Sequence, residues 1–195
     1  MLPNITIGTK NPHKFRQLST LVSGHFSPVS AEAWPEPDET ADSFLHVAEE
    51  KAEYYSRCAD GLAIASDAGA VFPGLKGWDP LKTKRFAEGD DAARAQALLE
   101  LMQNAGDRTV EWHEALAVAD NGRLLFSTVA RAMDGQVART LDPARLQPGL
   151  WLCAITEFPQ FGGRNFFDLT PQERAATEDS WAELGRRFAA WADPA

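Results

Sequence analysis

The stretch that decides the fold of this chain reads Ile5-Thr6-Ile7-Gly8-Thr9-Lys10-Asn11-Pro12-His13-Lys14. The apolar run 5–7 predicts a strand. Asn11 can cap a helix, and Pro12 suits the first position of that helix. Apolar residues then recur at helical spacing, at Phe15, Leu18 and Leu21/Val22. The sequence therefore predicts a strand, a tight polar loop and the N-terminus of a helix.

This loop carries the hydroxyl of Thr9, the amide of Asn11 and the ammonium of Lys14. The N-terminus of a helix presents N–H groups and a partial positive charge, which favour anions such as phosphate. An ordinary turn that happens to be polar is the alternative, because the loop is not a glycine-rich Walker loop.

Composition limits the classes of protein to consider. The chain has 195 residues, of which 44% are hydrophobic, enough for one sizeable core and a single domain over 1–195. No apolar run approaches the ~18 residues of a membrane helix. Two distant cysteines without metal-ligand spacing favour reduced thiols in the cytoplasm. The net charge of -9 argues against a nucleic-acid polymer as partner, although a local basic patch could bind a small anion.

Helical and extended patterns alternate along the chain, which predicts an α/β fold with a long mixed β-sheet and flanking helices. Asn121-Gly122 is a strong hairpin signal, and Thr170 to Glu173 form a capping box. The expected strands cover 5–7, 28–31, 62–65 with a continuation over 70–72, 110–119, 124–132, 137–140 and 150–155. The expected helices start at residues 12, 42, 91 and 171, and the C-terminal helix places Trp181, Leu184, Phe188 and Trp191 on one face.

Three further clusters carry chemistry. Asp67 follows a buried strand, where it could hold a metal or act as a general base, or could be a turn aspartate before glycine. Glu39 could bind magnesium and Lys51 could reach a phosphate, unless they belong to a solvated loop and helix face. The segment 77–86, with Thr83 and Arg85, is a third polar cluster or a solvated run of charges.

In order and spacing these clusters resemble the inosine triphosphate pyrophosphatase family. Its T-x-N-x-x-K loop corresponds to Thr9, Asn11 and Lys14, and its E-T/S-G-x-T-F…K-A segment to 39–44 with Lys51. Its D-D-S-G motif corresponds to 66–69. Its G-x-P-G-x-x-S-A-R-Y motif is matched loosely by 77–86, and the start of its last helix by 167–174.

The resemblance implies an elongated mixed α/β fold with two lobes around a central cleft, commonly assembled as a homodimer. It implies a hydrolase that cleaves a nucleoside triphosphate between its α- and β-phosphates, giving a monophosphate and pyrophosphate, with Mg²⁺ as cofactor. Glu39 and Asp67 would bind the metal, and Asp67 and Lys14 would be catalytic. The substrate-binding residues implied are Thr9, Asn11, Lys14, Lys51, Thr83, Arg85, Phe161 and Arg174.

Departures from the family pattern fall on two parts of the site. Ser66 replaces the first aspartate of D-D-S-G, and only Phe161-Gly162 remains of the F-G-Y-D-P stretch of the base pocket. The S-H-R triplet that reads the purine carbonyl should fall near Glu178-Asp179-Ser180, where neither its histidine nor its arginine is present. We therefore expect altered base specificity. Two alternatives remain: a nucleotide-binding or regulatory protein without turnover, and a hydrolase of a phosphorylated metabolite that is not a nucleotide.

Overall fold

The structure, a computed structural model, describes residues 1–38, 40–83, 85–177 and 180–193. Its internal contacts separate into two compact units. Unit 1 contains Met1–Ala68, His113–Ala130 and Ser180–Ala195, and unit 2 contains Gly69–Trp112 and Arg131–Asp179. The prediction of a single domain over 1–195, with two lobes around a cleft, remains a prediction.

A seven-stranded sheet in the order β2-β1-β3-β4-β5-β6-β7 confirms the predicted mixed α/β fold. β1 runs parallel to both β2 and β3, whereas β6 is antiparallel to β5 and β7. The strands are β1 Asn4–Ile7, β2 Ser27–Ser30, β3 Leu62–Val71, β4 Thr109–Asp120, β5 Arg123–Val137, β6 Thr156–Phe158 and β7 Arg164–Asn165. Three of them, β3, β4 and β5, contribute residues to both units.

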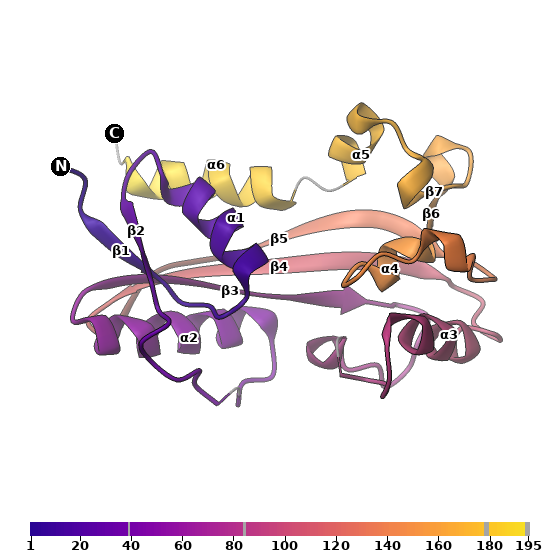
Figure 1. Cartoon of the computed structure of the whole chain (residues 1–195), viewed down its shortest axis with the longest axis horizontal. Coiled ribbons are helices and arrows are strands. Elements are labelled where there is room, and N and C mark those ends of the chain that lie inside the picture. The colour runs from indigo at the N-terminus through magenta and orange to yellow at the C-terminus, as the bar shows by residue number, and fades with distance from the viewer. Residues whose placement is uncertain (39, 84, 178–179, 194–195) are drawn as a thin grey trace. The chain divides into compact units, whose positions relative to one another are not determined.

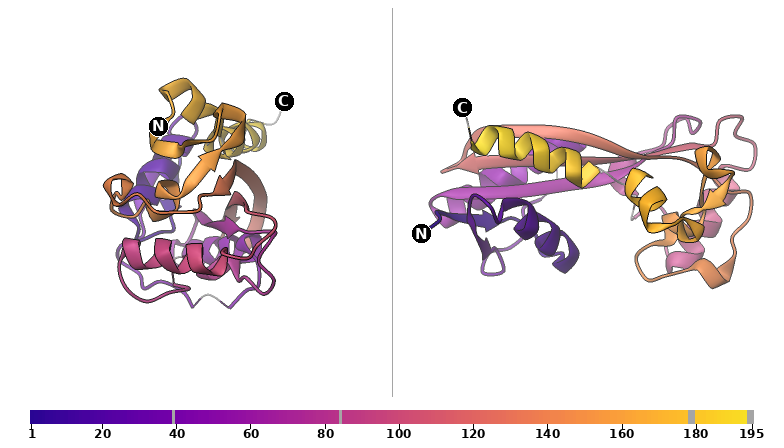
Figure 2. Two further views of the ribbon diagram at one scale, coloured as in Figure 1. Left: turned by 90° about the vertical axis from the view of Figure 1, so that its right-hand side faces the viewer. Right: turned by 90° about the horizontal axis from the view of Figure 1, so that it is seen from above.

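Unit 1 is a sheet covered by helices on both faces (Figure 1; Figure 2). Helices α1 (Pro12–Val22) and α6 (Ser180–Ala192) cover one face, where alternate strand residues pack with them in a core of Ile5, Ile7, Leu18, Val22, Ile64, Leu116, Val118, Leu184 and Phe188. Helix α2 (Phe44–Ala59) lies on the opposite face, where its Tyr55 packs against Ala63. The neighbours Ala63 and Ile64 thus show the alternation of β3 between the two faces.

Unit 2 has its own core around the remaining halves of the long strands. Helices α3 (Asp91–Leu101) and α4 (Trp151–Ala154) pack against β3, β4 and β5 residues in a cluster that includes Phe72, Leu98, Met102, Val110, Val137, Trp151, Leu152 and Ile155. Helix α5 (Pro171–Thr177) follows a short strand pair, β6 and β7. None of the helices in the described ranges is long and apolar enough to cross a membrane.

Most predicted elements are confirmed, but two of the expected strands are wrong, one entirely and one in part. Residues 150–155 were expected as a strand, but 151–154 form the buried helix α4. A short apolar run without a polar residue carries no period, so it is compatible with either structure. The strand expected over 137–140 is also wrong after Val137, which is the last residue of β5. The next residue, Ala138, donates its N–H to the Ile155 carbonyl.

Candidate active site

The chain reverses its winding direction beside β1, and this position organises the candidate site. α1 connects β1 to β2 on one face, and α2 connects β2 to β3 on the other. The carboxyl end of β1 therefore lies beside β3 at a topological switch point, the usual ligand position of an open α/β sheet. The loop of residues 8–11 leaves β1 here. Residues 66–67 lie within β3, two and three residues beyond Ile64, the last β3 residue that pairs with β1, so Asp67 does not follow the strand as expected but belongs to it.

The loop after β1 is closed by its own side chains. The hydroxyl oxygen of Thr9 accepts from the Asn11 N–H at 3.1 Å. The Asn11 amide oxygen accepts from the N–H groups of His13 and Lys14 at 2.8 and 3.4 Å, which confirms the predicted helix cap. Because these three N–H groups are bound inside the loop, we assign the main role in binding an anion here to lysine side chains.

Gly8 lets β1 and β3 approach α2 closely. Its N–H donates to the Ile64 carbonyl at 2.8 Å, and a Cβ at this position would lie 2.5 Å from Cδ2 of Tyr55. Burial, with the nearby charge of Glu36, raises the pKa of Tyr55 to about 12. The phenol is therefore neutral at physiological pH. The close contact with its ring is the reason why a glycine suits the position after β1.

Lys14 reaches from α1 across the end of β1 to two neighbouring strands. Its Nζ donates to the Ser66 carbonyl on β3 at 3.3 Å, and lies 3.6 Å from Oε1 of Glu114 on β4. β1 ends at Ile7, so it leaves the Ser66 carbonyl available to the lysine. The Lys14 side chain is 17% exposed and that of Glu114 only 4%, which makes this a largely desolvated ion pair.

A second ion pair joins α2 to β3. Lys51 Nζ lies 3.1 Å from Oδ1 of Asp67, and the two side chains are 15% and 17% exposed. Each candidate phosphate-binding lysine of unit 1 is thus paired with a carboxylate. A phosphate chain that approached these lysines would compete for them and would release carboxylate oxygens toward a cation.

Of the two predicted magnesium ligands, Asp67 is the one that lies among the described residues. Mg²⁺ is commonly held by one or two carboxylates together with substrate phosphates, so Asp67 fits this role. Glu39, the other predicted metal ligand, lies outside the described residues. Within the described ranges no group of three or more His, Cys, Asp or Glu side chains could hold a metal by itself.

Thr83 and Arg85, both predicted to bind substrate, lie in unit 2. The Thr83 hydroxyl is buried, accepts from the Ala70 N–H at 3.0 Å and donates to the Pro80 carbonyl at 2.6 Å. It ties the segment after β3 to that strand. Arg85 is exposed, and its N–H donates to the Lys82 carbonyl at 2.7 Å.

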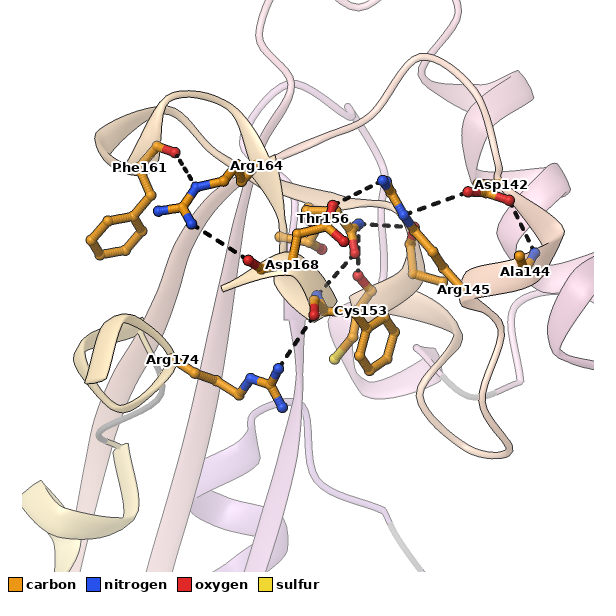
Figure 3. A network of polar contacts seen from close by, with 12 residues as sticks. Asp142, Ala144, Arg145, Cys153, Thr156, Phe161, Arg164, Asp168 and Arg174 are labelled. Atoms are coloured by element: carbon orange, nitrogen blue, oxygen red, sulfur yellow. Dashed lines mark hydrogen bonds and ion pairs between the residues drawn. The ribbon is translucent and has the colours of Figure 1, made fainter. Parts of the chain in front are cut away.

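Phe161 and Arg174 belong to a polar and aromatic network in unit 2 (Figure 3). The Arg174 guanidinium lies 4.9 Å over the ring of Phe166 and donates to the Phe167 and Leu169 carbonyls at 3.5 and 3.4 Å. Phe161 is half-buried, and its carbonyl accepts from Nε of Arg164 at 3.0 Å. The contacts of Arg174 are made within unit 2, whereas the Phe161 ring keeps part of its surface exposed.

The residues expected at the S-H-R position are only partly described. Glu178 and Asp179 lie outside the described residues, and Ser180 is the buried first residue of α6. Ser180 belongs to unit 1.

Sequence reasoning missed Glu114. It precedes Leu116 and Val118 by two and four residues on β4, so it shares their face, which packs under α1 and α6. An acidic residue on the apolar face of a predicted strand was the available signal, because a buried carboxylate needs a partner.

Comparison with known proteins identifies the family of this chain. The Ham1 family matches residues 5–144. The dITP/XTP pyrophosphatase of Caulobacter vibrioides is 31% identical over 193 residues, covering 95% of this chain and 94% of that protein. That of Rhodopseudomonas palustris is 34% identical over 180 residues, covering 87% and 83%. A Ham1 protein from Coxiella burnetii superposes with a TM-score of 0.81 at 22% identity, covering 97% and 99%. The chain therefore belongs to the Ham1 family, and the resemblance drawn from its motifs is confirmed.

Proposed function

We propose that this protein is a magnesium-dependent nucleoside triphosphate pyrophosphohydrolase, which releases a nucleoside monophosphate and pyrophosphate. The observation that carries the proposal is the pair of lysine–carboxylate contacts, Lys14–Glu114 and Lys51–Asp67, at the switch point of an α/β sheet. The names of its relatives, dITP/XTP pyrophosphatases, support the same reaction.

Lys14 and Lys51 neutralise the phosphate chain in this proposal and fix its direction across the carboxyl end of β1 and residues 66–67 of β3. Phosphoryl transfer depends mainly on positioning and charge stabilisation, which two largely buried ammonium groups provide. Mg²⁺, when bound, neutralises further phosphate charge. Asp67 orients the attacking water through its carboxylate, once the phosphate chain has taken Lys51 from it.

We also propose that base selection differs from that of inosine-selective relatives. Glu178, Asp179 and Ser180 replace the cationic donors that would read the carbonyl at position 6 of the purine. Carboxylates only accept hydrogen bonds, so they disfavour a carbonyl and suit an amino group. The exposed part of the Phe161 ring offers a surface on which a base could stack.

A panel of ribonucleoside and deoxyribonucleoside triphosphates, assayed with and without Mg²⁺, tests these proposals. We expect pyrophosphate release only with the metal, and at most a tenfold preference for inosine or xanthosine triphosphate over the adenosine and guanosine compounds. A stronger inosine preference would contradict altered base selection and leave the reaction itself supported. Tight binding of one compound without any turnover would instead favour a nucleotide-binding or regulatory protein.

We further propose that the enzyme is a cytoplasmic homodimer. Cys58 and Cys153 form no disulfide within the described residues, and reduced cysteines suit a reducing compartment.

A further inference from the structure

Glu114 is a largely buried carboxylate for which the sequence motifs give no role. It lies on β4, the residue as a whole is 3% exposed, and its carboxylate lies 3.6 Å from Nζ of Lys14. Ordinary core positions of this strand are apolar: Leu116 and Val118 follow on the same face and contact the α1 and α6 core. A carboxylate is costly to bury, so its presence beside a predicted phosphate-binding lysine requires a reason.

The neighbouring strand carries the complementary irregularity. Ser66 on β3 is 3% exposed, and its hydroxyl oxygen has no hydrogen-bond partner in the part of the chain that the structure describes. Ser66 follows Ile64 by two residues, so its side chain points to the same face as Ile64, the face that packs with α1. Ser66 and Glu114 therefore share one face of adjacent strands, and the Lys14 ammonium contacts both residues.

The charges of these groups balance. Among the described side chains of the two ion pairs, Lys14 and Lys51 supply two positive charges, and Glu114 and Asp67 supply two negative charges. Residue 66 is a neutral serine, and the carboxylate that compensates the charge of Lys14 among the described residues is Glu114. The carboxylate thus lowers the attraction of the site for a bare polyanion.

We propose that Glu114 is a positioning residue that holds Lys14 at the end of β1, supplying from β4 the negative charge that Ser66 lacks on β3. By doing so, it makes the site discriminate against triphosphate without metal, whose charge is greater than that of the magnesium complex. This inference rests on the proposed function for its ligand, but its central claim is an interchange of charge between residues 66 and 114.

Four proteins test the interchange: the wild type, Glu114→Gln, Ser66→Asp and the double variant Ser66→Asp/Glu114→Gln. Glutamine keeps the size of Glu114 and a hydrogen-bond acceptor, and removes the charge. Glu53→Gln, which removes a carboxylate paired with Arg57 on α2, is the matched control. The measurements are the unfolding midpoint in urea without ligand, and the Kd for inorganic triphosphate in the presence of a chelator or excess Mg²⁺.

In chelator, we expect Glu114→Gln to bind inorganic triphosphate roughly tenfold to a hundredfold more tightly, the effect of removing one nearby like charge at an effective dielectric constant of ~20. Ser66→Asp adds a second carboxylate and should weaken binding by a similar factor. The double variant should return to within about threefold of the wild type, and Glu53→Gln should not change. With Mg²⁺ the gain in Glu114→Gln should shrink several-fold, because the ligand carries less charge.

Three results would each overturn the proposal. The first is unchanged or weaker triphosphate binding in Glu114→Gln, and the second is an equal gain in its affinity with and without Mg²⁺. The third is a double variant that matches the wild type neither in its Kd for triphosphate nor in its urea midpoint. Without ligand, we expect Glu114→Gln to be less stable than the wild type or not to fold, and we expect the double variant to have a urea midpoint close to that of the wild type. A double variant that also fails to fold would show that charge at 66 cannot replace Glu114. If the wild type binds no triphosphate in either condition, the proposed function fails, and the urea midpoints alone still decide the interchange.

Discussion

At the scale of single residues, the site depends on a few contacts that the motifs do not specify. The motif gives Lys14 a role but not its partner, and it marks Gly8 only as part of a loop. The structure shows Lys14 paired with a buried carboxylate and Gly8 pressed against Tyr55. Both positions are sensitive for different physical reasons, one electrostatic and one steric.

Lys14→Ala should weaken triphosphate binding by about a hundredfold, while binding of the matching nucleoside changes less than about threefold. The substitution removes a positive charge at the phosphate chain and leaves Glu114 repelling it. Isothermal titration with both ligands measures the two losses. Arg16→Ala, an exposed residue on the same helix, is the control for charge alone. Equal losses for triphosphate and nucleoside would show that Lys14 does not contact phosphate.

Gly8→Ala should lower the free energy of unfolding by about 1–3 kcal/mol, because the added methyl group overlaps the Tyr55 ring and the Ile64 carbonyl. Gly24→Ala is a fitting control, since nothing lies within 4 Å of a Cβ added there. Urea unfolding of both variants gives the comparison. Equal stability of the two would mean that the packing of β1 against α2 tolerates a side chain.

At the scale of elements, signals that combine a period with a cap predict well. The Asn11-Pro12 start of α1, the capping box of α5 and the hairpin at Asn121-Gly122, with φ of 49° and 80°, all form as the sequence indicates. The helix α4 was misjudged because residues 151–154 are uniformly apolar and buried. Glu114 was missed because its meaning depends on Lys14, which is 100 residues distant in sequence and meets it only in the folded sheet.

The capping box of α5 makes a pH-dependent contribution to stability. The Thr170 N–H donates to the Glu173 carboxylate, and Arg164 adds its charge, so both hold the pKa of Glu173 below its ordinary value. The stabilisation is therefore complete above the ordinary glutamate pKa and is lost as the pH falls through the lower folded pKa.

Glu173→Gln should destabilise the protein at pH 7 and have little effect at a pH below the folded pKa of Glu173. Thermal unfolding from pH 7 down to pH 3 measures this convergence with the wild type. Glu88→Gln, an exposed position, should run parallel to the wild type throughout. A difference between Glu173→Gln and the wild type that stays constant with pH would contradict the assigned charge contact.

At the scale of the whole molecule, the residues assigned to phosphate and those assigned to the base belong to different parts of the chain. Lys14, Lys51 and Asp67 belong to unit 1, whereas Phe161 and Arg174 belong to unit 2. The residues of the first group fall in motifs that match the family pattern, and the structure joins two of them, Lys51 and Asp67, in an ion pair. The second group has a weaker basis in the sequence, because the loop that carries Phe161 departs from the family pattern.

The homodimer proposal predicts a mass in solution of twice the 21.4 kDa of the chain. Light scattering coupled to size-exclusion chromatography measures this mass directly. Measurements at protein concentrations above and below about 1 µM, a dissociation constant typical of weak assemblies, would detect dissociation. A mass of one chain at every concentration would contradict the homodimer and leave the catalytic proposal unaffected.

The measurement that tests the central claim most directly is pyrophosphate release by Asp67→Asn with a triphosphate and Mg²⁺. Asparagine keeps the shape of Asp67 and removes the charge that pairs with Lys51. Asp60→Asn is the control, because Asp60 is exposed and its left-handed φ of 50° suits asparagine equally well. We expect Asp67→Asn to lose at least about a hundredfold in kcat while remaining folded, with Asp60→Asn unchanged. Wild-type rates in Asp67→Asn would contradict a catalytic site at the carboxyl end of β1 and residues 66–67 of β3.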